Sequence, residues 1–155
     1  MDITIDVEEY KLNVRAAGII IHNNKILTHR NIKSDHYALI GGRVEIGEDS
    51  VATLKREIME EMGKEIEITG YISTIENFFE MDSRKYHEIM FVHKAEFKIE
   101  KDQKIEDTIK NIEGKDYLVY EWIPLEKIDE YTIKPEVVKE ILKKGNFPIH
   151  KINKD

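Results

Sequence analysis

The sequence predicts an α/β or α+β domain in which α-helices sandwich a mixed β-sheet. Three observations favour this class: β-rich runs near the N-terminus, one amphipathic helical segment further along, and more strand-like segments before a last amphipathic helix. A chain of 155 residues has the usual length of one domain, so we expect a single domain over residues 1–155.

The first expected elements are a β-hairpin and a short strand. Residues 13–31, NVRAAGIIIHNNKILTHRN, contain two β-rich runs on either side of Asn23-Asn24, a pair that favours a tight turn. Residues 37–40 form a short apolar run that ends at two glycines. We expect a strand there that gives way to a loop at the glycines.

The central helix is expected over residues 50–62, where apolar residues recur at helical spacing. The apolar stripe consists of Val51, Leu54, Ile58 and Met62. Either Asp49 or Ser50 is suited to cap the N-terminus of this helix. Gly63 suits the position after its last turn.

The sequence pattern in the second half of the chain predicts further strands and one more helix. Strands are expected over residues 65–79, 86–99 and 117–123, a charged loop over 101–115, and an amphipathic helix over 137–144. The polar stretch MDSRK joins the first two of these strands. Pro135 near the start of the helix and Gly145 after its end match the usual preferences at helix termini.

Composition excludes several classes of function. The chain has no cysteine, which rules out disulfides and thiolate metal sites and favours a reducing compartment. The formal net charge of −7 argues against a surface for duplex nucleic acid. The acidic N-terminus does not resemble a signal peptide and no stretch is apolar enough to span a membrane, so we expect a cytoplasmic protein.

The central helix carries an unusual cluster of acids. Glu57, Glu60 and Glu61 lie at spacings of three and four residues, at which like charges repel each other by a few tenths of a kcal/mol. They also lie near the C-terminal end of the helix, where the helix dipole disfavours negative charge. A divalent cation would remove this conflict. The alternative is an ordinary solvated helix face.

The residues around the helix complete a known pattern. Gly42, five residues, Glu48 and seven residues lead into REIMEEMG, residues 56–63. This pattern resembles the Nudix box, the signature of Nudix hydrolases, which cleave nucleoside diphosphates linked to another group. The sequence departs from the box at Lys64, where the family has an aliphatic packing residue. Residues 121–128, EWIPLEKI, are also similar to the family.

The resemblance implies a Nudix fold and a metal-dependent reaction. It implies that Glu57, Glu60 and Glu61, with the backbone carbonyl of Gly42, hold Mg²⁺ or Mn²⁺. It also implies an ion pair between Arg56 and Glu48 that braces the loop against the helix, and a role for Glu60 or Glu61 as the acceptor of a proton from water. We therefore expect Glu60, Glu61 and Arg56 to be catalytic, and Gly42, Glu48, Arg56 and Gly63 to form the structural frame of the box.

Many family members use a further acid from outside the box. Glu88 is the first candidate for that role here and Glu106 is the second, with an ordinary surface acid as the alternative for each. Arg15, Arg43, Arg84 and Glu88 are candidates for substrate binding. Arg15 is included because it stands in a strand of small and apolar residues, where an unpaired charge would be costly.

The segment IENFFEMDSRKYHEIMFV allows two interpretations. Phe78, Phe79 or Tyr86 can stack on a base while Arg84 and Lys85 meet phosphates. Alternatively the segment is a hairpin with core aromatics and a basic turn, which we favour for the two phenylalanines.

The expected partner is a small nucleoside diphosphate derivative, either a nucleoside triphosphate or a nucleotide sugar. An alternative function from another class is a Nudix-fold sensor that binds a nucleotide without turnover, although its acids would then be expected to have decayed. A homodimer is an expectation from the family resemblance.

Overall fold

The computed structural model describes residues 1–100 and 103–154. Within these residues a nine-stranded mixed sheet has the order β3-β4-β5-β2-β7-β6-β9, with β1 paired to β2 and β8 paired to β4. The strands are β1 (Thr4–Val7), β2 (Tyr10–Ile19), β3 (Ile21–His22), β4 (Lys25–Asn31), β5 (Ala38–Arg43), β6 (Ile66–Met81), β7 (Arg84–Phe97), β8 (Leu118–Pro124) and β9 (Ile149–Lys154).

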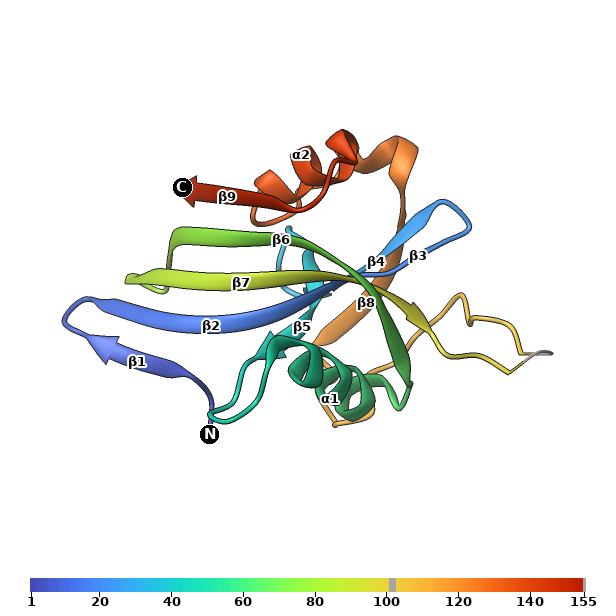
Figure 1. Ribbon diagram of the computed structural model, residues 1–155, viewed down its shortest axis with the longest axis horizontal. Coiled ribbons are helices and arrows are strands. Elements are labelled where there is room, and N and C mark those ends of the chain that lie inside the picture. The colour runs from blue at the N-terminus through green and yellow to red at the C-terminus, as the bar shows by residue number, and fades with distance from the viewer. Residues whose placement is uncertain (101–102, 155) are drawn as a thin grey trace.

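Two α-helices cover the sheet. They are α1 (Ser50–Met62) and α2 (Val137–Lys144), and a 3-10 helix, η1 (Leu125–Glu130), follows β8. Figure 1 shows α1 and α2 on opposite sides of the sheet, which confirms the predicted mixed sheet between helices. Among the described residues no helix has the length and apolar character needed to cross a membrane.

Strand β2 organises the sheet around the site. It pairs in parallel with β7 along its whole length. Its other edge is shared, because β1 pairs antiparallel with residues 10–13 and β5 pairs antiparallel with residues 15–18. Strand β9 adds a second parallel pairing at the edge of β6.

Local signals in the sequence predicted several elements correctly. Asn23 and Asn24 have φ values of 49° and 58°, which gives the hairpin its tight turn. Helix α1 has the expected bounds. Asp49 rather than Ser50 is its N-cap and accepts a hydrogen bond from the backbone N–H of Ala52 at 2.8 Å. Gly63 ends the helix with a φ of 64°.

The structure differs from the prediction at three strands. Strand β5 continues through Gly41 and Gly42 to Arg43 instead of ending at the glycines, because it pairs there with Ala16 and Ala17 of β2. Strands β1 and β9 were not predicted. Both are short, and nearly all their residues are exposed or half-buried, so the pairing with β2 and β6 determines their conformation rather than a buried hydrophobic face of their own.

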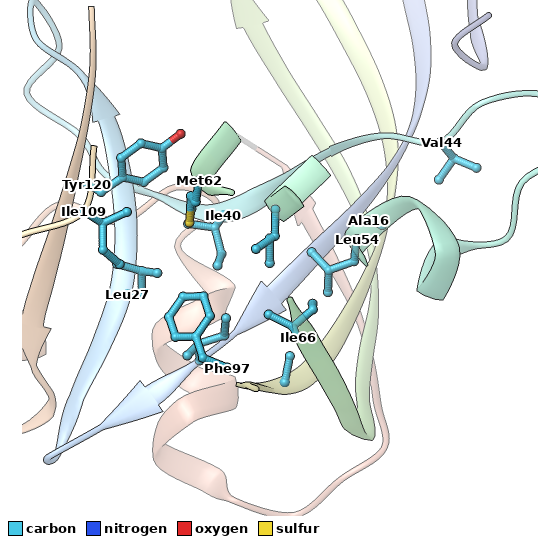
Figure 2. Close-up of a cluster of buried hydrophobic side chains, with 13 residues drawn as sticks. Ala16, Leu27, Ile40, Val44, Leu54, Met62, Ile66, Phe97, Ile109 and Tyr120 are labelled. Atoms are coloured by element: carbon cyan, nitrogen blue, oxygen red, sulfur yellow. The ribbon is translucent and has the colours of Figure 1, made fainter. Parts of the chain in front are cut away.

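Each face of the sheet carries its own hydrophobic cluster. Figure 2 shows the cluster under α1, in which Leu54 and Met62 pack with strand residues such as Ala16 and Ile40. The cluster on the other face includes Val138 and Ile141 of α2. The predicted charged loop has no helix or strand over residues 103–115, and residues 101 and 102 lie outside the described part. Its Ile109 is 4% exposed and packs into the α1 cluster, so this loop is anchored to the core.

The apolar stripe of α1 gives a test of the packing. We expect Ile58→Ala to lower the free energy of unfolding by about 2–5 kcal/mol, because Ile58 is 0% exposed and its truncation leaves a cavity. Met59→Ala is the control, since Met59 is 42% exposed on the same helix. Urea unfolding followed by circular dichroism measures both. Equal losses for the two variants would contradict this placement of α1.

Candidate active site

Arg56 joins helix α1 to the loop and strand that precede it. Its Nε and Nη2 atoms donate to Oε1 and Oε2 of Glu48, both at 2.9 Å, in a bidentate ion pair. The same Nη2 donates to the carbonyl oxygen of Arg43, the last residue of β5, at 3.2 Å. This is the ion pair between Arg56 and Glu48 that the resemblance to the Nudix box implied.

Arg56 also contacts two of the clustered acids on its own helix. Its Nη1 donates to Glu57 Oε1 at 2.7 Å and to Glu60 Oε2 at 3.2 Å. One guanidinium therefore offsets much of the repulsion expected on this face. The hydrogen bond from Arg56 lowers the pKa of Glu48 to about 2, and the same bond raises the pKa of Arg56.

Gly42 lets the Glu57 carboxylate lie directly against strand β5. A Cβ atom at position 42 would overlap the carboxylate carbon and both carboxylate oxygens of Glu57. Any side chain here would push Glu57 and α1 away from the strand. Gly42 of the sequence motif thus allows the Glu57 carboxylate to lie close to the backbone of β5.

Glu61 is the buried acid of the cluster, with 4% of its surface exposed. Its Oε2 accepts a hydrogen bond from the Tyr120 hydroxyl at 3.0 Å. Burial raises the pKa of Glu61, and the Tyr120 hydrogen bond opposes that rise. Lys115 Nζ lies 3.8 Å from Glu61 Oε1 and 2.6 Å from Glu113 Oε2, so this lysine bridges Glu61 to an acid in the loop before β8.

The donor chemistry of this cluster fits a hard divalent cation. Carboxylate oxygens are the ligands that such cations prefer. Burial is the main cause of the raised pKa of Glu61, and the charge of Glu57 adds to the rise. In residues 1–100 and 103–154 no three acidic or histidine side chains converge as a metal site. Arg56 holds Glu57 and Glu60, and Lys115 lies beside Glu61, so a cation would have to displace part of these contacts.

Three of the four predicted substrate-binding residues lie together. Arg15, Arg43 and Glu88 line one hollow of about 340 Å³ on the α2 face of the sheet. Arg15 Nη2 donates to the carbonyl oxygens of Leu39 and Gly41, at 3.2 and 3.3 Å, so it connects this hollow to the glycines of β5.

Arg84 lies outside the hollow, and neither Glu88 nor Glu106 lies beside the carboxylates of α1. Arg84 does not line the hollow and pairs with Asp6 of β1. Glu106 pairs with Lys64 at 3.3 Å, at the end of α1. Glu88 accepts hydrogen bonds from two asparagines within the hollow, apart from the carboxylates of α1. Glu113 is an acid outside the motif that Lys115 links to Glu61, whereas Glu88 and Glu106, the two candidates named from the sequence, have no such link.

The aromatic residues of the β6–β7 hairpin form two cross-strand stacks. Phe79 stacks on Tyr86 with ring centroids 4.7 Å apart, and both line the hollow. Phe78 stacks on His87 at 4.3 Å. Neither phenylalanine belongs to the hydrophobic clusters of the sheet, so the interpretation as core aromatics does not describe them.

Sequence reasoning missed the residues that surround Glu61. Tyr120 and Lys115 come from segments far from the motif. The pairing of β8 with β4 positions Tyr120, and the loop before β8, which carries Lys115, bonds to α1 through the Ile112 N–H and the Glu61 carbonyl oxygen at 2.8 Å. His29 of β4 packs near the Tyr120 ring, and burial lowers its pKa to about 3. Its Nδ1 is buried and has no hydrogen-bond partner among the described residues. In the sequence, Lys115 and Glu113 belong to the charged segment 101–115, and nothing in that pattern separates them from the other charged residues there.

Comparison with known proteins finds one matching family. The sequence profile described as NUDIX domain matches residues 12–144. An RNA pyrophosphohydrolase from Ruthia magnifica subsp. Calyptogena magnifica is 33% identical over 85 residues, which is 54% of this chain and 46% of that protein. The chain therefore matches about half the length of this relative.

Solved structures show the same fold. A MutT NUDIX hydrolase from Burkholderia pseudomallei superposes with a TM-score of 0.64 and 18% identity, over 87% of this chain and 98% of that chain. A UDP-X diphosphatase superposes with a TM-score of 0.60 and 17% identity, over 90% of this chain and 66% of that chain. The E. coli ORF135 protein has a TM-score of 0.55 and 23% identity, over 89% and 91% of the two chains.

The contact between Gly42 and Glu57 predicts a specific sensitivity. We expect Gly42→Ala to lower the melting temperature by several degrees, because a new Cβ collides with the Glu57 carboxylate. Gly70→Ala in β6 is the matched control, since a Cβ there meets only Lys94 Cβ at 4.0 Å. Differential scanning calorimetry compares the two variants. A Gly42→Ala protein as stable as Gly70→Ala would show that the close approach is not a constraint.

The Arg56–Glu48 pair predicts a contribution to stability that depends on pH. The pKa of Glu48 is about 2 in the folded protein against an ordinary value of 4.5. Its contribution is therefore complete above about pH 4.5 and is lost as the pH falls towards 2, and we expect it to be roughly 1–2 kcal/mol for a partly solvated pair. Urea unfolding at pH 7 and pH 3 measures it.

The comparison needs two variants. Glu48→Gln removes the titrating group and should lose more stability at pH 7 than at pH 3. Glu136→Gln, an exposed glutamate whose side chain makes no capping hydrogen bond at α2, is the control. A loss for Glu48→Gln that is the same at both pH values would contradict the assigned ion pair.

Proposed function

The chain belongs to the Nudix family, and from this membership and the geometry of α1 we propose that it is a divalent-metal-dependent pyrophosphohydrolase. The substrate class is a small nucleoside diphosphate linked to another group, either a nucleoside triphosphate or a nucleotide sugar. The observation that carries the proposal is the position of the Glu57 carboxylate directly against Gly42 of β5, four residues before the buried Glu61 on the same helix.

Glu57 and Glu61 are the residues that we assign to the metal, with Mg²⁺ or Mn²⁺ as the ion. When bound, such an ion neutralises charge on the diphosphate and lowers the pKa of a water molecule. Glu57 is held against Gly42, and Glu61 is fixed by the Tyr120 hydroxyl, so both carboxylates are oriented before any ligand arrives. The Gly42 carbonyl remains a proposed additional ligand.

Glu60 is the proton acceptor that we favour. Its side chain is 46% exposed, and within residues 1–100 and 103–154 its ion-pair partner is Arg56 at 3.2 Å, so it is accessible to water while Glu57 and Glu61 are used as ligands. Arg56 acts as a positioning residue, because it contacts Glu48, Glu57 and Glu60 at once. Glu113, which Lys115 connects to Glu61, is the acid from outside the motif that we add to this site.

A sensor that binds a nucleotide without turnover is the second candidate function. The complete set of acids and the intact Arg56 clamp favour the enzyme. A cytoplasmic location and a homodimer are further parts of the proposal, and analytical ultracentrifugation tests the second. The net charge of −7 supports a small-molecule substrate rather than duplex nucleic acid.

A nucleotide panel tests the function. Nucleoside triphosphates and nucleotide sugars are incubated with Mg²⁺, Mn²⁺ or EDTA, and released phosphate and pyrophosphate are measured. We expect turnover that requires the metal. Absence of turnover with every substrate and both metals would contradict the enzyme and leave the sensor.

Two substitutions test the assigned roles. We expect Glu60→Gln to lower kcat by about 10²–10⁴-fold with little change in the metal concentration required, because it removes a proton acceptor. We expect Glu61→Gln to raise the required metal concentration as well as lower kcat. Glu65→Gln, whose side chain is 67% exposed just beyond α1, is the control. Turnover unaffected by Glu61→Gln would contradict the site while leaving the activity.

A further inference from the structure

The hollow on the α2 face is built from three rows of side chains that run across the strands. The rows follow from the register, in which Phe79 is opposite Tyr86, Asn77 is opposite Glu88, and Arg15 is opposite both Met90 and Arg43. An aromatic row, a polar row and a row that ends in two arginines therefore lie side by side. All three line the same hollow of about 340 Å³.

The polar row extends across five neighbouring strands from β1 to β9. Its members are Thr4, Asn13, Glu88, Asn77 and Asn153, and each is directly opposite the next in the register. Thr4 donates to Asn13 Oδ1 at 3.1 Å, and Asn153 donates to Asn77 Oδ1 at 3.0 Å. Both amide oxygens are thus occupied, and both amide nitrogens face the acid between them.

Glu88 is the one acid of this row, and it is 7% exposed. Its contacts are long: Asn13 Nδ2 is 3.5 Å and Asn77 Nδ2 is 3.4 Å from its carboxylate oxygens. No cation of the described residues forms an ion pair with it. A buried carboxylate with two weak neutral partners retains unused acceptor capacity, which is costly unless a ligand supplies donors.

The floor of the hollow therefore offers a defined pattern: two carboxylate acceptors side by side, with an amide donor on each flank. Guanine presents the complementary edge, because its ring N1–H and exocyclic amino group are adjacent donors and its O6 is an acceptor next to them. The carboxylate can accept from both donors while an asparagine Nδ2 donates to O6. We propose that this hollow binds a guanine-type base, and that Glu88 selects it.

The other common bases match this pattern less well. Adenine and cytosine each present one amino donor beside an unprotonated ring nitrogen, which the second carboxylate oxygen would repel. Uracil presents one N–H between two carbonyl oxygens. Hypoxanthine keeps N1–H and O6 and lacks the amino group, so it loses one of the two bonds to Glu88.

The two outer rows orient the ligand. Phe79 and Tyr86 provide an aromatic wall for a planar base. On the other side of Glu88, Arg15 and Arg43 supply positive charge for a phosphate. Arg15 contacts the Gly41 carbonyl, and Arg43 also pairs with Asp2 at 3.4 Å, a contact that a phosphate would share or replace. A nucleotide with its base on Glu88 therefore directs its phosphates towards Arg15 and Arg43 at the β5 side of the hollow, while the carboxylates of α1 lie on the opposite face of that strand.

This inference rests on the proposed function for its choice of a nucleotide, and a binding experiment keeps the two separate. Titration calorimetry of the full chain in EDTA measures affinities for GDP, IDP, ADP and CDP without hydrolysis. We expect GDP to bind about ten- to a hundredfold more tightly than ADP or CDP, with IDP between them. Equal affinities for all four nucleotides would overturn the inference.

Glu88→Gln sharpens the test, because an amide pairs one acceptor with one donor and so matches the edge of adenine. We expect the ratio of GDP to ADP affinity to fall at least tenfold in this variant. The control is Glu76→Gln on the adjacent strand, where Glu76 contacts His150 rather than the hollow, and it should keep the ratio. If Glu88→Gln fails to fold, the series of four nucleotides with the native protein decides alone.

The outcomes separate the two proposals. Metal-dependent hydrolysis with no preference among bases would leave the proposed function and overturn the base pocket. Preference for GDP without hydrolysis of any guanine nucleotide would support the pocket and contradict the enzyme. Tight binding of methylguanidine together with equal affinities for the nucleotides would show a simple cation site and overturn the guanine assignment.

Discussion

The interaction on which the site depends is the set of contacts made by one guanidinium group. Arg56 reaches Glu48 in the loop, the Arg43 carbonyl at the end of β5, and Glu57 and Glu60 on its own helix. These partners come from three consecutive pieces of chain, the end of β5, the loop and α1, which core packing and a hydrogen bond from Thr53 to Glu48 also hold together. With Arg56 in place, an acidic face that would repel itself becomes an ordered array of carboxylates next to the backbone of β5.

That array is compatible with the sheet only because β5 keeps its pairing with β2 through two glycines. The strand supplies the surface against which Glu57 lies, and the missing side chain at Gly42 sets how closely α1 can approach. The same strand ends in Arg43, whose side chain lines the hollow on the opposite face while its carbonyl binds Arg56. The carboxylate cluster and the hollow thus lie on the two sides of one strand, so a shift of β5 would move both.

The sequence predicted what local patterns determine and failed where distant segments decide. The bounds of α1, its caps, and the turn at Asn23-Asn24 follow from spacing and from preferences of single residues, and all were correct. The continuation of β5 through its glycines was missed because glycine normally weakens a strand, and here the pairing with β2 compensates. The environment of Glu61 was missed for a related reason. Tyr120 reaches it through the pairing of β8 with β4, and Lys115 reaches it from the loop before β8, so no short window of sequence encodes either contact.

The polar row across the sheet has a consequence for how the protein is made. Its outer members, Thr4 and Asn153, come from the first and last strands of the described chain, and Glu88 lies between them. During synthesis on the ribosome, β1, β2, β6 and β7 emerge long before β9 is available. The hydrophobic contacts under α1 need no residue from β9, so they can form first, whereas Asn77 obtains its partner Asn153 only after β9 has been made. The packing under α1 and the polar row at the floor of the hollow therefore form at different times during synthesis of the chain.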